Sequence, residues 1–436
     1  MNDFINVIGA GLAGAEASLQ IAKRGIKVKL YEMRPKKTTG AHKTEKYAEF
    51  VCSNSLGSFD TSNASGLLKK EMEILGGELI KIAYETQVPA GSALAIDREG
   101  FSERVTELIN SNPLIEVINE EVEEIPEGLT VIASGPLTSE VFAEAIKRFT
   151  KSEHLHFFDA IAPIIEKDSI DFDKAFYASR YDKGEASYIN CPMNKEEYEK
   201  FYGILTTAPR IELKDFEKDA KFFESCLPVE VLASRGVDTL RFGPMKPVGL
   251  VDKRTGEENY AVVQLRQDNS AKTLYNIVGF QTNLKWGSQK ELINSIPGLE
   301  NANIIRYGVM HRNTFINSPR VLNRTLNARE RKDLFFAGQI TGTEGYTESI
   351  ATGMYAGINA SKMFLGEDLL ELPLETILGA LTNYISDEQH DKFQPINSNW
   401  GILPPVELPK KERKNKKMKA ELMAKRSIES LEGLRQ

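Results

Sequence analysis

The sequence predicts an α/β fold in which a parallel, Rossmann-like sheet is interrupted by an inserted α+β domain. Two segments far apart in the chain each show an apolar strand that enters a glycine-rich turn and then a helix. The stretch between them has short alternating strands and polar loops instead. A sheet that the chain leaves and later re-enters makes its domain discontinuous, so we expect the middle stretch to be an insertion.

The first segment is a strand–helix–strand unit at the N-terminus. Residues 4–8 form an apolar run, and the glycine-rich turn at 9–14 leads into a helix pattern that continues to Ala22. After Gly25, the alternating run at 27–32 predicts a second strand. This order is the βαβ start of a dinucleotide-binding domain.

The glycine turn predicts a pyrophosphate site. Gly9 allows a tight turn, Gly11 lets the backbone approach the phosphates, and Gly14 allows close packing of helix on strand. The phosphates would lie on amides at the helix N-terminus. Glu32 ends the second strand, where a carboxylate can bond a ribose hydroxyl. NAD and FAD share this pattern, so it does not choose between them. The residues expected against the cofactor are Gly9, Ala10, Gly11, Leu12, Ala13, Gly14 and Glu32.

The second segment favours FAD. An apolar run at 129–133 stops at Ser134, and a later run at 334–337 meets Gly338 before a long helix of small residues. A second strand–glycine–helix entry into the same sheet can place amides at the far end of an extended cofactor. This suits FAD, which spans its domain, and adds Gly338 to the expected cofactor residues.

The middle of the chain reads as a separate α+β unit. The runs "YAVVQLRQ" and "LYNIVGFQT" alternate as strands do, and "NKEEYEKFYGIL" has a helical pattern. We therefore expect a first part of the FAD-binding domain at 1–170, an inserted α+β domain at 171–322, a second part of the FAD-binding domain at 323–405, and a basic tail at 406–436.

Composition fits a globular protein of a reducing compartment. The 436 residues are 41% hydrophobic and 27% charged, enough to bury a core without disulfides or metals. Three cysteines, an odd number spread far apart, are typical of the cytosol. The start "MNDFINVIGAG" lacks the pattern of a secretory signal, and no apolar run is long enough to span a membrane. We expect a cytoplasmic protein.

Charge is distributed unevenly along the chain. The formal net charge is −7, but the window 410–426 holds nine Lys or Arg and two Glu, which leaves −14 for the rest. A basic tail on an acidic body can be an electrostatic arm for RNA. The alternative is a solvated, frayed C-terminus.

Several stretches together resemble one family, the folate- and FAD-dependent RNA (uracil-5-)-methyltransferases known as TrmFO, which are relatives of the GidA flavoproteins. The resemblance extends from about residue 5 to 405 and implies a GidA-type FAD-binding domain with an insertion. The matching stretches include "NVIGAGLAGAEA", "LYEMRP", "VCSNSL", "VPAGSALAIDR", "LYNIVGFQTNLKWGSQK", "YGVMHRNTFINSP" and "LFFAGQITGTEGYTES".

The resemblance implies a reaction and its partners. Family members transfer a methylene group from 5,10-methylenetetrahydrofolate to C5 of a uridine, and flavin reduced by NADH or NADPH turns it into a methyl group. The usual target is the T-loop uridine of tRNA, whereas some paralogues act on ribosomal RNA. Gly57 stands where the family pattern has Lys or Arg, so both RNAs stay open as targets. The oligomeric state stays open too.

Cysteine suits this chemistry. C5 of uracil is a poor nucleophile until a thiolate adds at C6, and a base must later remove the C5 proton. The resemblance aligns Cys52 and Cys226 with the family's two catalytic cysteines. We expect Cys226 to be the C6 nucleophile and Cys52 to abstract the proton or hold the methylene. Cys191 is expected to be a packing residue.

The resemblance also implies residues for the other partners. His311 would stack on the pterin of folate, and Tyr346 would border the flavin ring. Lys285 and Arg312, together with the tail, are candidates for RNA binding. No His or Cys cluster has metal-ligand spacing, so no metal is expected. Three more residues of the inserted domain are open to folate, RNA or solvent: Arg266, Asn283 and Trp286.

Three other functions stay open. A GidA-like flavoprotein would modify the tRNA wobble uridine with a partner protein, but "VCSNSL" and "YGVMHRNTFINSP" favour the methyltransferase branch. A flavin-containing RNA chaperone would need neither cysteine. An enzyme that only oxidises NAD(P)H with a small molecule would need no folate.

Overall fold

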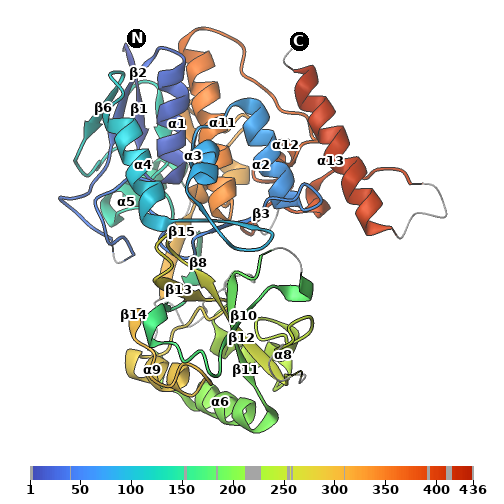
Figure 1. Ribbon diagram of the computed structural model, residues 1–436. Helices are drawn as coiled ribbons and strands as arrows, with labels where there is room; N and C mark the ends of the chain where they lie inside the picture. Colours follow the sequence, from blue (N-terminus) through green and yellow to red (C-terminus); the bar gives the residue numbers. More distant parts are fainter. Residues whose placement is uncertain are drawn as a thin grey trace.

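The computed structural model describes residues 3–39, 41–151, 155–182, 185–211, 227–252, 256, 259–308, 310–389, 393–408 and 415–434. Figure 1 shows two bodies, with the chain ends in the upper one and the middle of the chain in the lower one. No helix in these ranges is both long and apolar enough to cross a membrane.

The upper body is built on a five-stranded parallel sheet in the order β16-β7-β1-β2-β6. Strand β16 joins late in the chain and pairs with β7, so that Leu334 lies opposite Thr130. This arrangement confirms the predicted α/β fold with a Rossmann-like sheet and an interrupted chain. The strands are β1 (Phe4–Ile8), β2 (Lys27–Tyr31), β6 (Ile115–Ile118), β7 (Thr130–Ile132) and β16 (Leu334–Phe336).

Helices α1 (Leu12–Lys23) and α11 (Tyr346–Phe364) pack closely beside this sheet. A Cβ at Gly353 would lie 2.2 Å from the carbonyl oxygen of Ala13, so only glycine lets the two backbones approach this far. The other helices of this body are α2 (Ala64–Leu75), α3 (Leu79–Glu85), α4 (Arg98–Asn110), α5 (Glu140–Thr150), α10 (Ser318–Val321), α12 (Ile377–Tyr384) and the short η5 (Gln339–Thr341) and η6 (Trp400–Ile402). A small sheet contains β3 (Ser55–Ser58), β5 (Ala93–Ile96) and β4 (Gln87–Val88).

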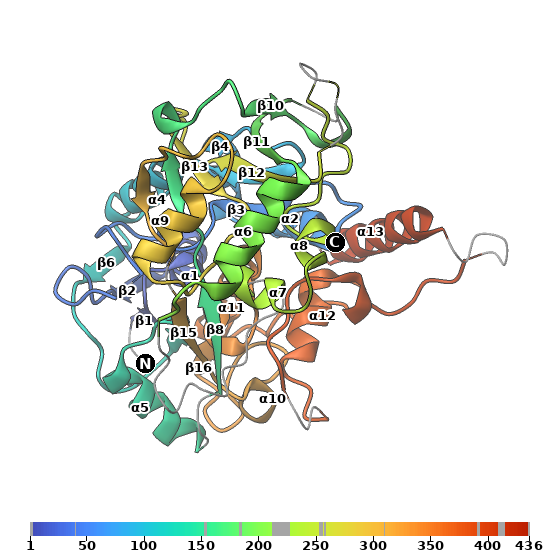
Figure 2. The same cartoon turned by 90° about the horizontal axis from the view of Figure 1, so that it is seen from below.

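The lower body holds a six-stranded antiparallel sheet in the order β10-β11-β12-β13-β9-β14. Helices α6 and α9 lie side by side over it in Figures 1 and 2. Its strands are β9 (Ile164–Glu166), β10 (Phe176–Ala178), β11 (Tyr188–Met193), β12 (Ala261–Gln267), β13 (Leu274–Ile277) and β14 (Ile304–Arg306). Its helices are α6 (Lys195–Thr207), α7 (Val229–Ala233), α8 (Thr239–Phe242), α9 (Trp286–Asn294), η1 (Lys167–Ser169) and η2 (Arg180–Asp182).

Two antiparallel strands, β8 (Leu155–Ala160) and β15 (Met310–Phe315), connect the bodies. The main hydrophobic cluster of the lower body draws on residues 165–302, and that of the upper body on residues before 147 and after 314. The domain boundaries at 171 and 322 remain a prediction. Because β9 belongs to the six-stranded sheet, we propose that the insertion runs from β9 to β14, residues 164–306.

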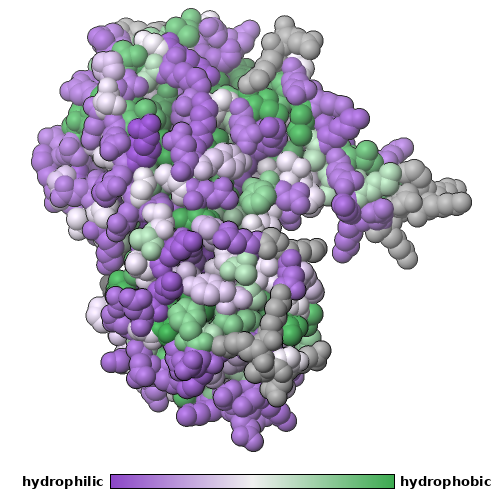
Figure 3. All heavy atoms as spheres, in the orientation of Figure 1, coloured by the Kyte–Doolittle hydropathy of each residue, from purple (hydrophilic) through white to green (hydrophobic). Residues whose placement is uncertain are grey.

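The end of the chain forms a docked helix, α13 (Lys416–Gly433). Met423 and Leu431 are buried, and Ser427 donates a hydrogen bond of 2.6 Å to the buried carboxylate of Glu71 on α2. A frayed terminus is therefore the wrong alternative for residues 415–434, because one face of this helix is packed. The outward face of α13 is mainly hydrophilic in Figure 3.

Candidate active site

The glycine turn between β1 and α1 has the geometry of a phosphate cradle. Gly9 has a φ of +98°, and a Cβ there would lie 2.7 Å from the carbonyl oxygen of Ala133. A Cβ at Gly14 would lie 1.8 Å from the carbonyl oxygen of Gly9. In contrast, a Cβ at Gly11 would meet nothing within 4 Å, and no side chain caps α1 at this residue. The helix N-terminus therefore faces open space, as anion binding requires.

An elongated groove runs past this turn along the carboxyl ends of the parallel strands. Glu32 and Arg34 line it, and so do Gly338 and Tyr346 from the far part of the chain. This is the edge where open α/β sheets bind their ligands. Further lining comes from Ile8, Gly9, Gly11, Leu12, Ala13, Val51, Ala133, the loop 134–139, Gln339 and Ser349.

Glu32 is held in place by the buried guanidinium of Arg34. Arg34 donates from Nε to Oε1 of Glu32 at 2.9 Å and from Nη2 to Oε2 at 3.2 Å, while the amide of Ala10 donates to Oε2 at 3.0 Å. Burial alone would raise the pKa of Glu32, but the hydrogen bonds and charge of Arg34 outweigh it and lower the pKa. The carboxylate is therefore ionised and oriented beside the phosphate cradle.

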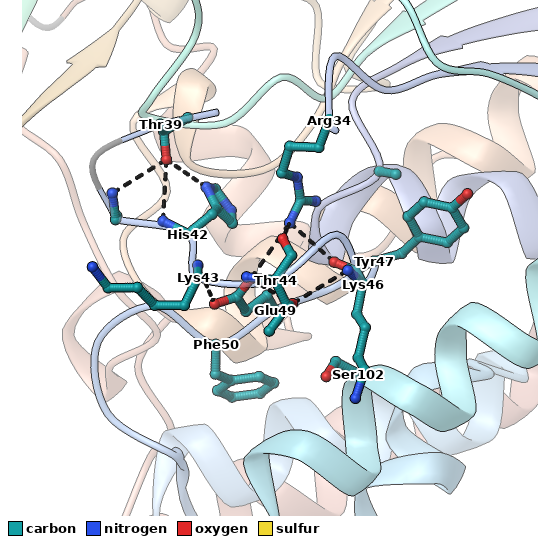
Figure 4. A network of polar contacts seen from close by, with 12 residues as sticks. Arg34, Thr39, His42, Lys43, Thr44, Lys46, Tyr47, Glu49, Phe50 and Ser102 are labelled. Atoms are coloured by element: carbon teal, nitrogen blue, oxygen red, sulfur yellow. Dashed lines mark hydrogen bonds and ion pairs between the residues drawn. The ribbon is translucent and has the colours of Figure 1, made fainter. Parts of the chain in front are cut away.

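Arg34 also holds a loop whose residues line the groove, and Figure 4 shows its contacts. Its Nη1 donates to the carbonyl oxygens of Thr44 and Lys46 and lies 3.5 Å from the carboxylate of Glu49. Burial, and then the charge of Arg34, lowers the pKa of His42 to about 4. His42 is thus neutral at pH 7, and its Nδ1 lies 2.6 Å from the hydroxyl of Thr39.

The groove opens into a second cavity of about 550 Å³ that contains Cys52. Tyr346 stands at the junction, because its hydroxyl accepts the backbone N–H of Cys52 at 2.6 Å and its ring packs on Phe50. The two spaces share Val51, Pro136, Leu137, Gln339 and Tyr346. The lining also contains Leu56 and Ile161 and a set of polar and acidic side chains, namely Ser53, Ser55, Ser65, Asn313, Glu344, Glu348, Asn397 and Ser398.

Two arginines fix the backbone of the cysteine loop. Arg98, at the start of α4, donates to the carbonyl oxygens of Phe50 and Cys52, the latter at 3.0 Å. Arg306, at the end of β14, donates to the carbonyl oxygen of Val51 at 2.5 Å. Three successive carbonyls are therefore held by side chains from two different bodies of the molecule.

The counter-charge for these arginines comes from the inserted body. Asp268 pairs with Arg98 at 2.8 Å, and both side chains are nearly buried. Burial works to lower the pKa of Arg98, but the Asp268 carboxylate raises it overall. The pKa of Arg306 is lowered by burial and by the charge of Arg98, and both guanidiniums interact electrostatically with Cys52. Two cations and one anion therefore lie beside the cysteine loop.

The structure places some of the predicted site residues together, whereas others lie outside the described residues. Cys52, Tyr346, Gly338 and Glu32 line the groove and its adjoining cavity together with four residues of the turn, Gly9, Gly11, Leu12 and Ala13. Ala10 and Gly14 are buried and do not line the groove. Cys226 lies outside the described residues. His311 and Arg312 belong to β15, but only their backbone is described. Among the described residues, no group of His, Cys, Asp or Glu is arranged to hold a metal ion.

The remaining candidates belong to the inserted body. Lys285 and Trp286 are exposed at the start of α9. Asn283 is buried, and its side chain donates to the carbonyl oxygen of Ile211 at 3.1 Å, so it supports the fold. Arg266 donates from Nε to the side chain of Asn54, two residues after Cys52. Sequence reasoning assigned no role to Arg34, Arg98, Arg306 or Asp268, although "LYEMRP" and "VPAGSALAIDR" contain the first two.

Comparison with known proteins places the chain in a family. A family model described as glucose inhibited division protein A matches residues 4–368. A protein of Bacillus velezensis named methylenetetrahydrofolate--tRNA-(uracil-5-)-methyltransferase TrmFO is 59% identical over 98% of this chain and 98% of its own length.

The chain belongs to the TrmFO family.

Another TrmFO relative, from Bacillus subtilis, is 58% identical over 98% of both chains. Among solved structures, Aquifex aeolicus GidA in its form I crystal matches with a TM-score of 0.68 at 18% identity, covering 98% of this chain and 77% of that one. Its form II crystal gives a TM-score of 0.67 at 19% identity, over 88% of this chain and 67% of that one. These structural matches show that this chain shares the fold of GidA.

Proposed function

We propose that this protein is a methylenetetrahydrofolate- and FAD-dependent methyltransferase that forms 5-methyluridine in RNA, with the T-loop uridine of tRNA as its target. The observation that carries the proposal is the junction at Tyr346, where a phosphate-cradling groove opens into a cavity with a cysteine. The names of relatives at 59% identity support the same reaction.

The residues that line the groove suit FAD. The amides of the 9–14 turn would hold the pyrophosphate, Glu32 would hold the ribose, and Gly338 and Tyr346 would border the flavin ring. Bound there, FAD would supply the reducing equivalents that convert the transferred carbon into a methyl group. The reductant that recharges it is proposed to be NADH or NADPH.

The cysteines would carry the steps on the base. The thiolate of Cys226 forms a bond to C6 of uridine, and the resulting enolate attacks the methylene carbon through C5. The thiolate of Cys52 would take the proton from C5, or hold the methylene before transfer, and the bond from the methylene carbon to the folate nitrogen would break with its electron pair leaving on tetrahydrofolate. The bond from sulfur to C6 would break as the reducing equivalents that the flavin supplies reach the methylene carbon, so that the ring regains its double bond and the carbon becomes a methyl group. The Arg98 and Arg306 contacts fix Cys52 for this task.

The other predicted partners extend this proposal. His311 would stack on the pterin, while Lys285, Arg312 and the basic end of the chain would bind RNA phosphates. The target base would have to leave its loop to reach the cavity. The cytoplasm, where tRNA and reduced cysteines occur together, is the proposed location.

The proposal is tested with purified holoprotein, carbon-labelled methylenetetrahydrofolate, NADH, and tRNA and ribosomal RNA transcripts in separate reactions. Label at C5 of one tRNA uridine is expected. Label only in ribosomal RNA would keep the chemistry and overturn the tRNA target. If neither RNA is labelled while the bound flavin is reducible, the methyltransferase proposal fails. A double variant of Cys52 and Cys226 that keeps its cellular effect would indicate an RNA chaperone instead.

A further inference from the structure

An aromatic pair on the inserted body includes an exposed tryptophan. Trp286, the first residue of α9, is 60% exposed, although tryptophan usually buries most of its surface. Its ring stacks on that of Tyr307, with centroids 5.4 Å apart and planes 17° from parallel. Tyr307 directly follows β14, so the pair joins two elements that Figure 1 shows on one side of this body.

The backbone beneath this pair is rigid. The buried amide of Gln289 on α9 donates from Nε2 to the carbonyl oxygen of Gly308 at 2.8 Å and accepts the N–H of Gly308 at 2.8 Å. A Cβ at Gly308 would lie 2.6 Å from the carbonyl oxygen of Ile161, so the chain runs too close for any other residue. The stacked rings are therefore presented on a fixed support, which lowers the entropy lost when a ligand binds.

The pair is linked to the cysteine loop through Arg306. Arg306, adjacent to Tyr307, donates to the carbonyl oxygen of Val51, and Val51 lines both the groove and the cavity. Lys285, adjacent to Trp286, is exposed and provides a cation for a phosphate. A flat aromatic surface with a neighbouring cation is the combination that binds unpaired nucleotides, through stacking of the base and attraction of the backbone.

We propose that Trp286 and Tyr307 form a stacking platform for an unpaired nucleobase of the RNA substrate, next to the base that is methylated. This inference rests on the proposed RNA methyltransferase function and extends it, because it states how unpaired nucleotides of the RNA loop are bound. A base stacked there extends the aromatic pair to three rings, and Lys285 neutralises its phosphate. Double-stranded RNA, whose bases are stacked already, offers no base to this surface.

Intrinsic fluorescence gives a direct test, because the chain has only two tryptophans, Trp286 and Trp400. In the Trp400→Phe variant, all tryptophan emission comes from Trp286. We expect a hairpin RNA with a uridine-containing loop to quench this emission at saturation, and a fully paired duplex of equal length to leave it unchanged. Because base stacking is measured in the resting holoprotein, the result does not depend on methyl transfer.

Substitution measures the size of the effect. Trp286→Ala is expected to weaken hairpin binding roughly 5- to 100-fold, while Trp286→Phe retains most of the affinity. Phe242→Ala is the matched control, since Phe242 is 82% exposed on α8 of the same body and its removal should leave affinity unchanged. Flavin content, read from absorbance, checks that each variant is folded.

Three other outcomes would contradict the proposed stacking platform. Quenching by methylenetetrahydrofolate but not by RNA would assign Trp286 to the folate. Quenching that grows with protein concentration alone would assign it to contact between two copies of the chain. Equal hairpin affinity for Trp286→Ala and the parent, with methyl transfer intact, would remove this inference and leave the proposed function standing.

Discussion

The loop around Cys52 and the strand around Cys191 place the same side chain in opposite surroundings. Cys52 is half-buried at a cavity, its backbone held by Tyr346 and two arginines. Cys191 lies in the centre of β11, is fully buried among apolar side chains, and faces Val263 of β12. The difference teaches that the thiol alone does not predict chemistry; neighbouring cations and access to a cavity do.

The largest expected difference between the two regions is in thiol reactivity. With the protein reduced beforehand, iodoacetamide should label Cys52 at least about a thousandfold faster than Cys191, since Cys191 is exposed only when its core unfolds. Peptide mass spectrometry resolves the two sites. Comparable labelling of both in the native protein would contradict the contrast.

A buried hydroxyl should reveal the packing role of Cys191. Cys191→Ser places a hydroxyl in an apolar cluster, so we expect the free energy of unfolding to fall by about 1–3 kcal/mol. Cys52→Ser, at a half-buried position beside a cavity, should change it much less. Urea denaturation followed by circular dichroism measures both, and a larger loss for Cys52→Ser would reverse the interpretation.

Removing Arg98 tests how the cysteine loop controls the reactivity of Cys52. Arg98→Met should slow alkylation of Cys52 at pH 7 by about tenfold, because it removes a cation and two hydrogen bonds from the loop. Arg104→Met is the control on the same helix, since Arg104 is exposed and pairs only weakly with Glu85 and Glu107. Equal slowing in both variants would show that the effect is not specific to the loop.

The smallest expected effect is a pH dependence of stability. Burial, and then the charge of Glu300, raises the pKa of Cys191 above its ordinary value of 9.0. Only the unfolded chain ionises just above pH 9, so the stability that this thiol contributes is complete below that pH and lost as pH rises. Relative to Cys191→Ala, the parent should lose up to about 1.4 kcal/mol of unfolding free energy per pH unit above 9. If the free energy of unfolding fell with pH equally steeply in the parent and in Cys191→Ala, the argument from burial would be contradicted.

Local patterns made much of the fold predictable. The strand at 4–8 has the same bounds in the structure, and the glycine turn adopts the tight geometry that its spacing requires. The second strand ends at Tyr31, one residue before the prediction, and the carboxylate of Glu32 accepts the amide N–H of Ala10.

Contacts between distant segments could not be predicted from the sequence. Asp268 meets Arg98 across 170 positions, and Arg306 reaches Val51 across 255, so no local pattern marks either pair. Likewise, the charges of the basic tail left open an RNA-binding arm and a frayed terminus, and no local pattern predicted that Ser427 would dock α13 on the buried carboxylate of Glu71. Such pairings depend on how the inserted body sits against the parallel sheet.

The most direct test of the account is a single-turnover reaction with pre-reduced holoprotein, carbon-labelled methylenetetrahydrofolate and tRNA, run side by side for the parent, Cys52→Ala and Cys191→Ala. We predict label at C5 of uridine with the parent and with Cys191→Ala, and none with Cys52→Ala although its flavin is bound and reduced. Transfer by Cys52→Ala at the parent rate would contradict the account.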